Sequence, residues 1–128
     1  RDQSLLTSLQ VSQLEKIIAR LRDLIPSQPA SLLHGDLWSG NLITDRHGNP
    51  ALIDPAVYYG WAEAELAMTE LFGHYPEMFY VAYQEINPLE IGYRSRFPVY
   101  NLYHLLNHLN LFGRSYSAQI QRVLSRFS

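Results

Sequence analysis

Apolar residues recur at spacings of three and four along the first part of the chain. Between residues 4 and 25 this stripe consists of Leu5, Leu6, Leu9, Leu14, Ile17, Ile18, Leu21 and Ile25. The spacing places these side chains on one face of a helix. Pro26 and Pro29 end the pattern, because proline disfavours helical backbone before it. We therefore predict one amphipathic helix over 4–25.

The pattern changes after the two prolines. Short apolar runs follow, each bounded by Gly, Asp, Asn or Pro, at 32–33, 42–44 and 51–53. The segment between the last two runs, Asp45–Pro50, contains Gly, Asn and Pro and is rich in turn-forming residues. This chemistry predicts a β-hairpin formed by 42–45 and 51–54.

The helical period returns after Gly60. Helices are predicted over 62–72, 76–86, 98–112 and 115–127. Gly73 is placed as the C-cap of the first of these, and Pro76 and Pro98 as first-turn residues of the next two. The expected fold class is α+β: a mainly helical chain with a small β-hairpin inserted after its first helix.

Composition narrows the classes of function. The chain has 128 residues, enough for one domain with a core, and 47% apolar against 17% charged residues argues against disorder. A net charge of −2 without a basic run argues against nucleic-acid binding. We see no apolar run long enough for a membrane span and no signal peptide. The absence of cysteine excludes disulfides and thiolate metal sites, and is compatible with a cytoplasmic protein.

Three oxygen-bearing side chains frame the predicted hairpin. Asp36 and Asn41 lie in a loop that contains Gly35 and Gly40, and these glycines allow sharp turns that bring the two side chains to one cavity. Asp54 closes the second predicted strand, directly before a proline. The same types of residue also form turns, caps and strand ends, so each one alone has an equally good structural explanation.

Together the three residues match what phosphoryl transfer requires. A carboxylate orients the acceptor hydroxyl and takes its proton, while an amide oxygen and a second carboxylate hold Mg²⁺ against nucleotide phosphates. Hard oxygen ligands without a cysteine or paired-histidine set suit Mg²⁺ better than Zn²⁺. The combination favours a phosphotransferase over chance turn chemistry.

Several strings of residues extend this match. The segment His34–Asn41 resembles the catalytic loop of protein-kinase-like phosphotransferases, in the His-Gly-Asp form of aminoglycoside and choline kinases. Ile53-Asp54-Pro55 stands where that superfamily carries its metal-binding aspartate. The strings "HGDLWSGN", "DPAVYYG", "ELAMTELFG" and "LYHLLNHLNLFG" together resemble the fructosamine kinase (ketosamine-3-kinase) family, over residues 32–116.

This resemblance implies a role for each residue. Asp36 would be the catalytic base, and Asn41 and Asp54 the Mg²⁺ ligands. ATP would be the phosphate donor, and the acceptor would be the 3-hydroxyl of a sugar attached to an amine, on a small molecule or a glycated protein. Phosphorylation at that position promotes loss of the sugar, so the family is associated with repair of glycation.

Neighbouring residues are weaker candidates. The indole of Trp38 could form a platform for the sugar, or could simply cover the loop. Tyr58 and Tyr59 could line the acceptor cleft, and packing explains them equally well. For His34 we expect a hydrogen bond to the backbone that braces the loop.

Two features of a complete kinase are missing from the sequence. There is no Gly-x-Gly-x-x-Gly segment, and the single lysine, Lys16, lies in the first helical pattern. We therefore expect residues 1–128 to be the C-terminal lobe of a protein-kinase-like fold, lacking the nucleotide lobe and turning over little alone. The surface so exposed could support self-association. Two alternatives stay open: a kinase for aminoglycosides, choline or another small alcohol, and a non-catalytic binding module.

Overall fold

The computed structural model describes residues 5–128, so the predicted helix start at Ser4 lies outside the described residues. The chain is α+β and mostly helical, as predicted, with two small sheets. It divides into two compact units. Unit 1 combines the chain up to Pro26 with Pro98–Ser128, and unit 2 is Ser27–Phe97.

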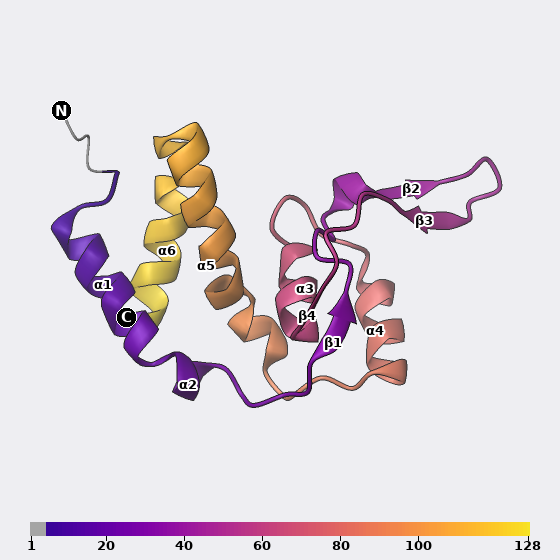
Figure 1. Ribbon diagram of the computed structural model, residues 1–128, viewed down its shortest axis with the longest axis horizontal. Coiled ribbons are helices and arrows are strands. Elements are labelled where there is room, and N and C mark those ends of the chain that lie inside the picture. The colour runs from indigo at the N-terminus through magenta and orange to yellow at the C-terminus, as the bar shows by residue number, and fades with distance from the viewer. Residues whose placement is uncertain (1–4) are drawn as a thin grey trace. The chain divides into compact units, whose positions relative to one another are not determined.

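Unit 1 is a set of helices around an apolar core. It contains α1 (Ser8–Ala19), α2 (Leu21–Leu24), most of α5 (Tyr93–Phe112), a short 3₁₀ turn (Arg114–Tyr116) and α6 (Ser117–Phe127). Helix α6 lies beside α1 (Figure 1). The buried apolar side chains are Ile17, Val99, Leu102, Leu105, Leu109, Ile120, Val123 and Leu124. Hydrophobic burial at helical spacing therefore accounts for this unit.

The prediction of one continuous helix over 4–25 is wrong at residues 5–7 and at Arg20, and the last helical turn, α2, ends at Leu24 rather than Ile25. Helix α1 begins at Ser8 behind a capping box, in which Thr7 and Gln10 each bond the other's backbone amide. At Arg20 the backbone leaves helical geometry, with φ −104° and ψ 5°. Its guanidinium donates to the carbonyl oxygen of Phe127 (3.3 Å), so the break sits where the chain contacts α6's end.

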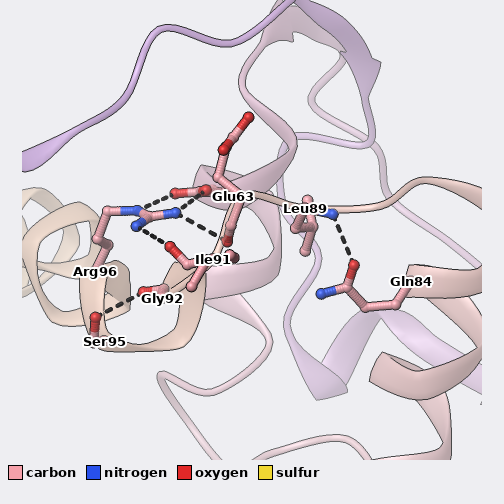
Figure 2. Close-up of polar contacts among 8 residues, drawn as sticks. Glu63, Gln84, Leu89, Ile91, Gly92, Ser95 and Arg96 are labelled. Atoms are coloured by element: carbon pink, nitrogen blue, oxygen red, sulfur yellow. Dashed lines mark hydrogen bonds and ion pairs between the residues drawn. The ribbon is translucent and has the colours of Figure 1, made fainter.

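Helix α5 also begins earlier than predicted, at Tyr93 rather than Pro98. Proline inside a helix loses one backbone hydrogen bond, and its ring crowds the preceding turn. The helix nevertheless starts upstream because the turn before it is held by side chains. Arg96 donates to the carbonyl oxygens of Glu90 and Ile91, and Ser95 donates to that of Gly92 (Figure 2).

Unit 2 holds both two-stranded sheets. The predicted hairpin is present, slightly shorter, as β2 (Leu42–Thr44) paired antiparallel with β3 (Pro50–Leu52), and it projects beyond the rest of its unit (Figure 1). The second sheet, β1 (Ser31–Leu33) against β4 (Tyr58–Gly60), was not predicted. The aromatic and β-branched run at 57–59, between a proline and a glycine, is the signal that could have found β4.

Two helices complete unit 2: α3 (Ala62–Met68) and α4 (Glu77–Ile86). Helix α4 matches its prediction, but α3 ends at Met68 rather than at residue 72. Thr69 caps it and donates its hydroxyl to the Leu66 carbonyl. The buried apolar residues of this unit are Leu33, Leu37, Ala62, Leu66, Ala67, Met68, Tyr75, Tyr80 and Phe97. Over residues 5–128, no helix combines the length and apolar character needed to cross a membrane.

Candidate active site

The loop from His34 to Asn41, called the 34–41 loop below, follows directly from β1. Gly35 has φ +87°, and a β-carbon there would overlap the carbonyl oxygen of Ala56. Only glycine fits such a conformation and such a close approach without strain. The loop ends in a 3₁₀ turn, Ser39–Asn41, that leads into β2. The sharp turn expected at Gly35 is therefore present, and Asp36 is the residue that directly follows it.

Asp36 and Asn41 are in direct contact. The side-chain nitrogen of Asn41 donates to both the backbone oxygen and Oδ2 of Asp36, each at 2.9 Å. Because both partners are acceptors, the amide must present its nitrogen to them and its oxygen Oδ1 elsewhere. Within residues 5–128 that oxygen accepts no hydrogen bond, although the residue itself is buried. Asn41 thus offers one uncommitted oxygen beside the Asp36 carboxylate.

Asp54 is joined to the same loop through its neighbours. The amide of Ile53 donates to the Asn41 carbonyl oxygen (3.0 Å), and the amide of Ala56 donates to that of His34 (2.8 Å). Asp54 has φ +51°, the sole positive φ at a non-glycine residue in the described part of the chain. Aspartate tolerates this conformation better than most residues. Its exposed carboxylate makes no hydrogen bond to any residue from 5 to 128.

His34 links the two segments. Its Nδ1 accepts from the Asp36 amide (3.3 Å), so Nε2 carries the proton and donates to the carbonyl oxygen of Ile53 (2.9 Å). One imidazole thus spans the 34–41 loop and the residue before Asp54. The hydrogen bond to the backbone expected of His34 is present in this form.

The donor set suits a hard cation. Asn41 Oδ1 and the Asp54 carboxylate are oxygen donors, which is the chemistry of Mg²⁺ rather than Zn²⁺. The described residues 5–128 contain no group of three or more His, Cys, Asp or Glu able to hold a metal. An ion here would therefore draw its remaining ligands from water and from a bound nucleotide, as Mg²⁺ commonly does.

Trp38 follows Asp36 by two residues and packs against a second aromatic ring. Its indole packs edge-on against Phe72, with ring centroids 6.2 Å apart, and it also lies over Gly40. Gly40 lies in the 3₁₀ turn Ser39–Asn41, so the turn expected there is present, although its φ is not positive. It is glycine because a β-carbon would collide with the indole. Trp38 keeps part of its surface exposed.

The two tyrosines have separate surroundings. In β4, Tyr58 pairs with Leu33 and Tyr59 with Leu32, and neighbouring strand residues point to opposite faces. The Tyr58 ring packs against Gly35, and burial, with the charge of Glu65, raises its pKa. Tyr59 is 74% exposed.

Sequence reasoning missed the partner of Gly35. The Gly35 amide donates to Oε1 of Glu65 on α3, at 2.7 Å. It also missed Tyr75, whose hydroxyl donates a long hydrogen bond (3.5 Å) to the Trp38 carbonyl oxygen. These partners are far from the loop in sequence, and no spacing rule connects them. The resemblance noted around "ELAMTELFG" and "DPAVYYG" is the nearest signal.

Tyr75 also lines a cavity of about 530 Å³. It is lined by Glu70, His74, Tyr75, Pro76, Glu77, Tyr80 and Arg94. The Arg94 guanidinium stacks over the Tyr80 ring and pairs with both glutamates, at 3.3 Å to Glu70 and 2.9 Å to Glu77. None of the candidate site residues lines this cavity.

Comparison with known proteins decides the family. A family model described as fructosamine kinase matches residues 3–128. The chain belongs to the fructosamine kinase family. The resemblance inferred from "HGDLWSGN" and its companion strings is confirmed.

The similarities to individual proteins agree with this family assignment. A probable ketoamine kinase of Enterococcus faecium is 53% identical over 96 residues, which cover 75% of this chain and 35% of the relative. The chloroplastic protein-ribulosamine 3-kinase of Arabidopsis thaliana is 45% identical, with 75% of this chain and 29% of the relative covered. A crystal structure of a candidate fructosamine-3-kinase from Thermobifida fusca superposes with TM-score 0.82 at 38% identity, over 98% of this chain and 45% of that one.

This family member therefore spans about a third of the length of the curated relatives that it matches. The part of the chain that the family model matches, residues 3–128, contains the 34–41 loop, Asp54 and their supporting contacts. The fold of that portion is shared with the solved relative.

Proposed function

We propose that the chain is the catalytic C-terminal lobe of a protein-kinase-like enzyme that transfers the γ-phosphate of ATP to a ketosamine. The acceptor is a hydroxyl, O3, of a sugar attached to an amine, on a small molecule or a glycated protein. Family membership and the names of the ketoamine and ribulosamine kinases support this acceptor. The observation that carries the proposal is the Asn41 amide bonded to Asp36 beside the segment that bears Asp54.

The roles follow from the geometry and from phosphoryl-transfer chemistry. Asp36 accepts the proton of the acceptor hydroxyl as its oxygen bonds to phosphorus and ADP leaves. The Asn41 amide nitrogen, by donating to Asp36, orients that carboxylate. Asn41 Oδ1 and the Asp54 carboxylate would hold Mg²⁺, which neutralises charge on the nucleotide phosphates.

The surrounding residues receive supporting roles in the same proposal. The exposed indole surface of Trp38 stacks on the sugar, and His34 holds the 34–41 loop against the Asp54 segment. Tyr58 packs on Gly35, next to Asp36, and is the better placed tyrosine for the acceptor, whereas Tyr59 is exposed on the opposite face of β4. The lack of cysteine fits a cytoplasmic enzyme. Self-association of the lobe stays a prediction.

A panel of acceptors tests the proposal in the full-length enzyme. The protein is incubated with ATP, Mg²⁺ and one acceptor at a time: a fructosyl-amine, a ribulosyl-amine, an aminoglycoside or choline. We expect phosphorylated sugar-amine, detected by ³¹P NMR and mass spectrometry. Phosphorylation of an aminoglycoside or choline alone would move the enzyme to the second candidate class. No transfer to any acceptor would favour a binding module and contradict the proposal.

A further inference from the structure

The cavity that Tyr75 lines takes no part in the phosphate transfer described above. Its volume of about 530 Å³ lies within the range usual for sites that bind small molecules. The α3–α4 connection, the first turns of α4 and the first turn of α5 form its walls, and every lining residue belongs to unit 2. The cavity is therefore a candidate ligand site within one unit.

The segment 72–75 connects this cavity to the proposed sugar platform. The Phe72 ring packs edge-on against the Trp38 indole, and the Tyr75 hydroxyl donates to the Trp38 carbonyl oxygen at 3.5 Å. Tyr75 and its neighbour His74 line the cavity, so the cavity adjoins the platform. In a ketosamine the amine is close to O3 along the sugar chain. The group attached to that amine must therefore also lie near the platform.

The wall of the cavity carries more negative than positive charge. Its guanidinium, Arg94, pairs with both of its carboxylates, at 3.3 Å to Glu70 and 2.9 Å to Glu77. Two carboxylates against one guanidinium leave a formal charge of −1 while His74 is neutral. Oε2 of Glu70 accepts no hydrogen bond from any residue between 5 and 128. The cavity thus offers an uncommitted carboxylate oxygen to a cationic ligand.

The rest of the lining suits an alkyl chain. Tyr75, Pro76 and Tyr80 supply aromatic and apolar surface beside the charged groups. The ion pairs with Arg94, whose guanidinium also stacks over the Tyr80 ring, hold the wall in place before a ligand arrives. A preformed wall loses less side-chain freedom on binding. An alkyl chain that ends in a positive charge matches both parts of this lining, whereas one that ends in a carboxylate is repelled.

We propose that this cavity is the subsite for the substituent on the acceptor's amine, and that it favours a substituent with a positive charge at its far end. Such substituents occur in ketosamines of diamines and of peptides with a basic residue beside the glycated lysine. This inference rests on the proposed function. The cavity binds and selects the acceptor without touching the reacting atoms, so its effect falls on KM rather than on kcat.

Three ketosamines with the same sugar and different amines test the subsite in the full-length enzyme. The fructosyl derivatives of cadaverine, pentylamine and δ-aminovalerate end in an ammonium, a methyl and a carboxylate. At about pH 8, where free imidazole is neutral, we expect KM to be about tenfold lower for the ammonium end than for the methyl end, and highest for the carboxylate. Equal KM values for the three acceptors would overturn the proposal.

Variants of the two glutamates show whether the cavity causes this preference. Glu70→Gln and Glu77→Gln each remove a negative charge from the wall, and Glu85→Gln removes an exposed charge from α4 outside the cavity as the matched control. We expect the tenfold preference for the ammonium end to fall to about twofold in the cavity variants and to persist in Glu85→Gln. A preference that persists in both cavity variants would overturn the proposal.

Binding of cadaverine alone provides a readout that does not depend on activity. In ¹⁵N NMR of the chain we expect cadaverine to shift the backbone amides of Glu70, His74, Tyr75 and Glu77 in a saturable way, and pentylamine to require about tenfold higher concentration. These shifts would support the subsite even if the enzyme phosphorylates no ketosamine, an outcome that contradicts the proposed function alone. Absent or non-saturable shifts at these amides would overturn the subsite whatever the activity.

Discussion

Two loops within residues 5–128 pair an aspartate with an asparagine, and they differ in how far the aspartate carboxylate is committed to hydrogen bonds. In the hairpin loop, residues 45–49, the Asp45 carboxylate accepts from the amides of His47 and Asn49 and from the Asn49 side chain at 2.9 Å. In the 34–41 loop the Asp36 carboxylate accepts from the Asn41 side chain, also at 2.9 Å, and from no other group among residues 5–128.

The comparison separates turn formation from chemistry. Asp45 is committed to holding its own backbone, which is the ordinary role of aspartate in a turn. The backbone of the 34–41 loop is held mainly by partners outside it. The Glu65 carboxylate accepts from the Gly35 amide, the Ala56 amide donates to the His34 carbonyl, and the His34 ring bonds the Ile53 carbonyl. Support from outside the loop leaves Asp36 and the Asn41 oxygen available. An aspartate whose loop is built by other residues is the better candidate for a catalytic group.

Replacing each of the two aspartates by asparagine, one at a time, should give the largest difference in kcat. We expect Asp36→Asn to lower kcat of the full-length enzyme about 1000-fold, because the amide cannot take the hydroxyl proton. Asp45→Asn, the matched change in the hairpin loop, should leave kcat within about twofold. Steady-state kinetics with a ketosamine measure both, and circular dichroism confirms that the folds are retained. A comparable loss of kcat in both variants would contradict the assignment of a catalytic role to Asp36 and a purely structural role to Asp45.

The glycines of the two loops provide the next contrast. Gly35 and Gly48 have similar φ, +87° and +83°, but a β-carbon at Gly48 meets nothing within 4 Å. Gly35→Ala should cost roughly 3 kcal/mol of unfolding free energy, from strain and overlap together, and Gly48→Ala about 1 kcal/mol from strain alone. Urea unfolding measures both. Equal costs would mean that Gly35 is not confined by Ala56.

Asn41→Ala should have a smaller effect on catalysis than loss of the base. It removes a proposed Mg²⁺ ligand and the hydrogen bond that orients Asp36. We expect the Mg²⁺ concentration for half-maximal rate to rise about tenfold, since metal sites with altered ligand shells lose affinity on this scale. Asn49→Ala, the equivalent change in the hairpin loop, should leave the Mg²⁺ dependence unchanged. A Mg²⁺ titration of the rate decides, and no shift for Asn41→Ala would contradict the ligand role.

The smallest effect concerns pH. The Asn49 side chain foremost, and then the amides of Asn49 and His47, hold the pKa of Asp45 below its usual range. Its contribution to stability is therefore present above the unfolded pKa, about 3.9, and is lost as pH falls through the lower folded value. NMR titration of the carboxyl carbon should place the midpoint below that of the unfolded chain. Asn49→Ala should raise the Asp45 midpoint toward the unfolded value. An unchanged midpoint would contradict Asn49 as the main cause of the lowered pKa.

Sequence patterns correctly predicted the helices and strands that are determined by residues close to one another in the chain. The hairpin, α4 and most of α6 follow from turn chemistry and helical spacing, and the Asp36–Asn41 pairing follows from two residues within one loop. The early start of α5 could not be read from Pro98, because it depends on Arg96 bonding the backbone of the preceding turn. Strand β4 was missed because a three-residue strand has little periodicity of its own.

The contacts that hold the candidate site in place could not be predicted from the sequence for a related reason. Glu65 lies on a helix and bonds a glycine amide in a loop distant in sequence, and nothing in its spacing marks it. Gly40 lies in the turn to which it was assigned, but the position is a glycine because the indole of Trp38 lies over it. For Glu65 the decisive partner comes from tertiary packing, which a single sequence does not display. For Gly40 it is Trp38, two residues away, and spacing alone does not fix where that ring lies.

The indole that covers Gly40 has a consequence for changing the acceptor. Any side chain at position 40 would push Trp38 out of its place, so the backbone side of this aromatic surface cannot be enlarged or reshaped. Phe72, which meets the indole edge-on and is itself partly exposed, is the other wall. Under the proposed sugar-stacking role of Trp38, engineering toward bulkier glycated amines should begin at Phe72, where a shorter side chain opens room without disturbing the glycine.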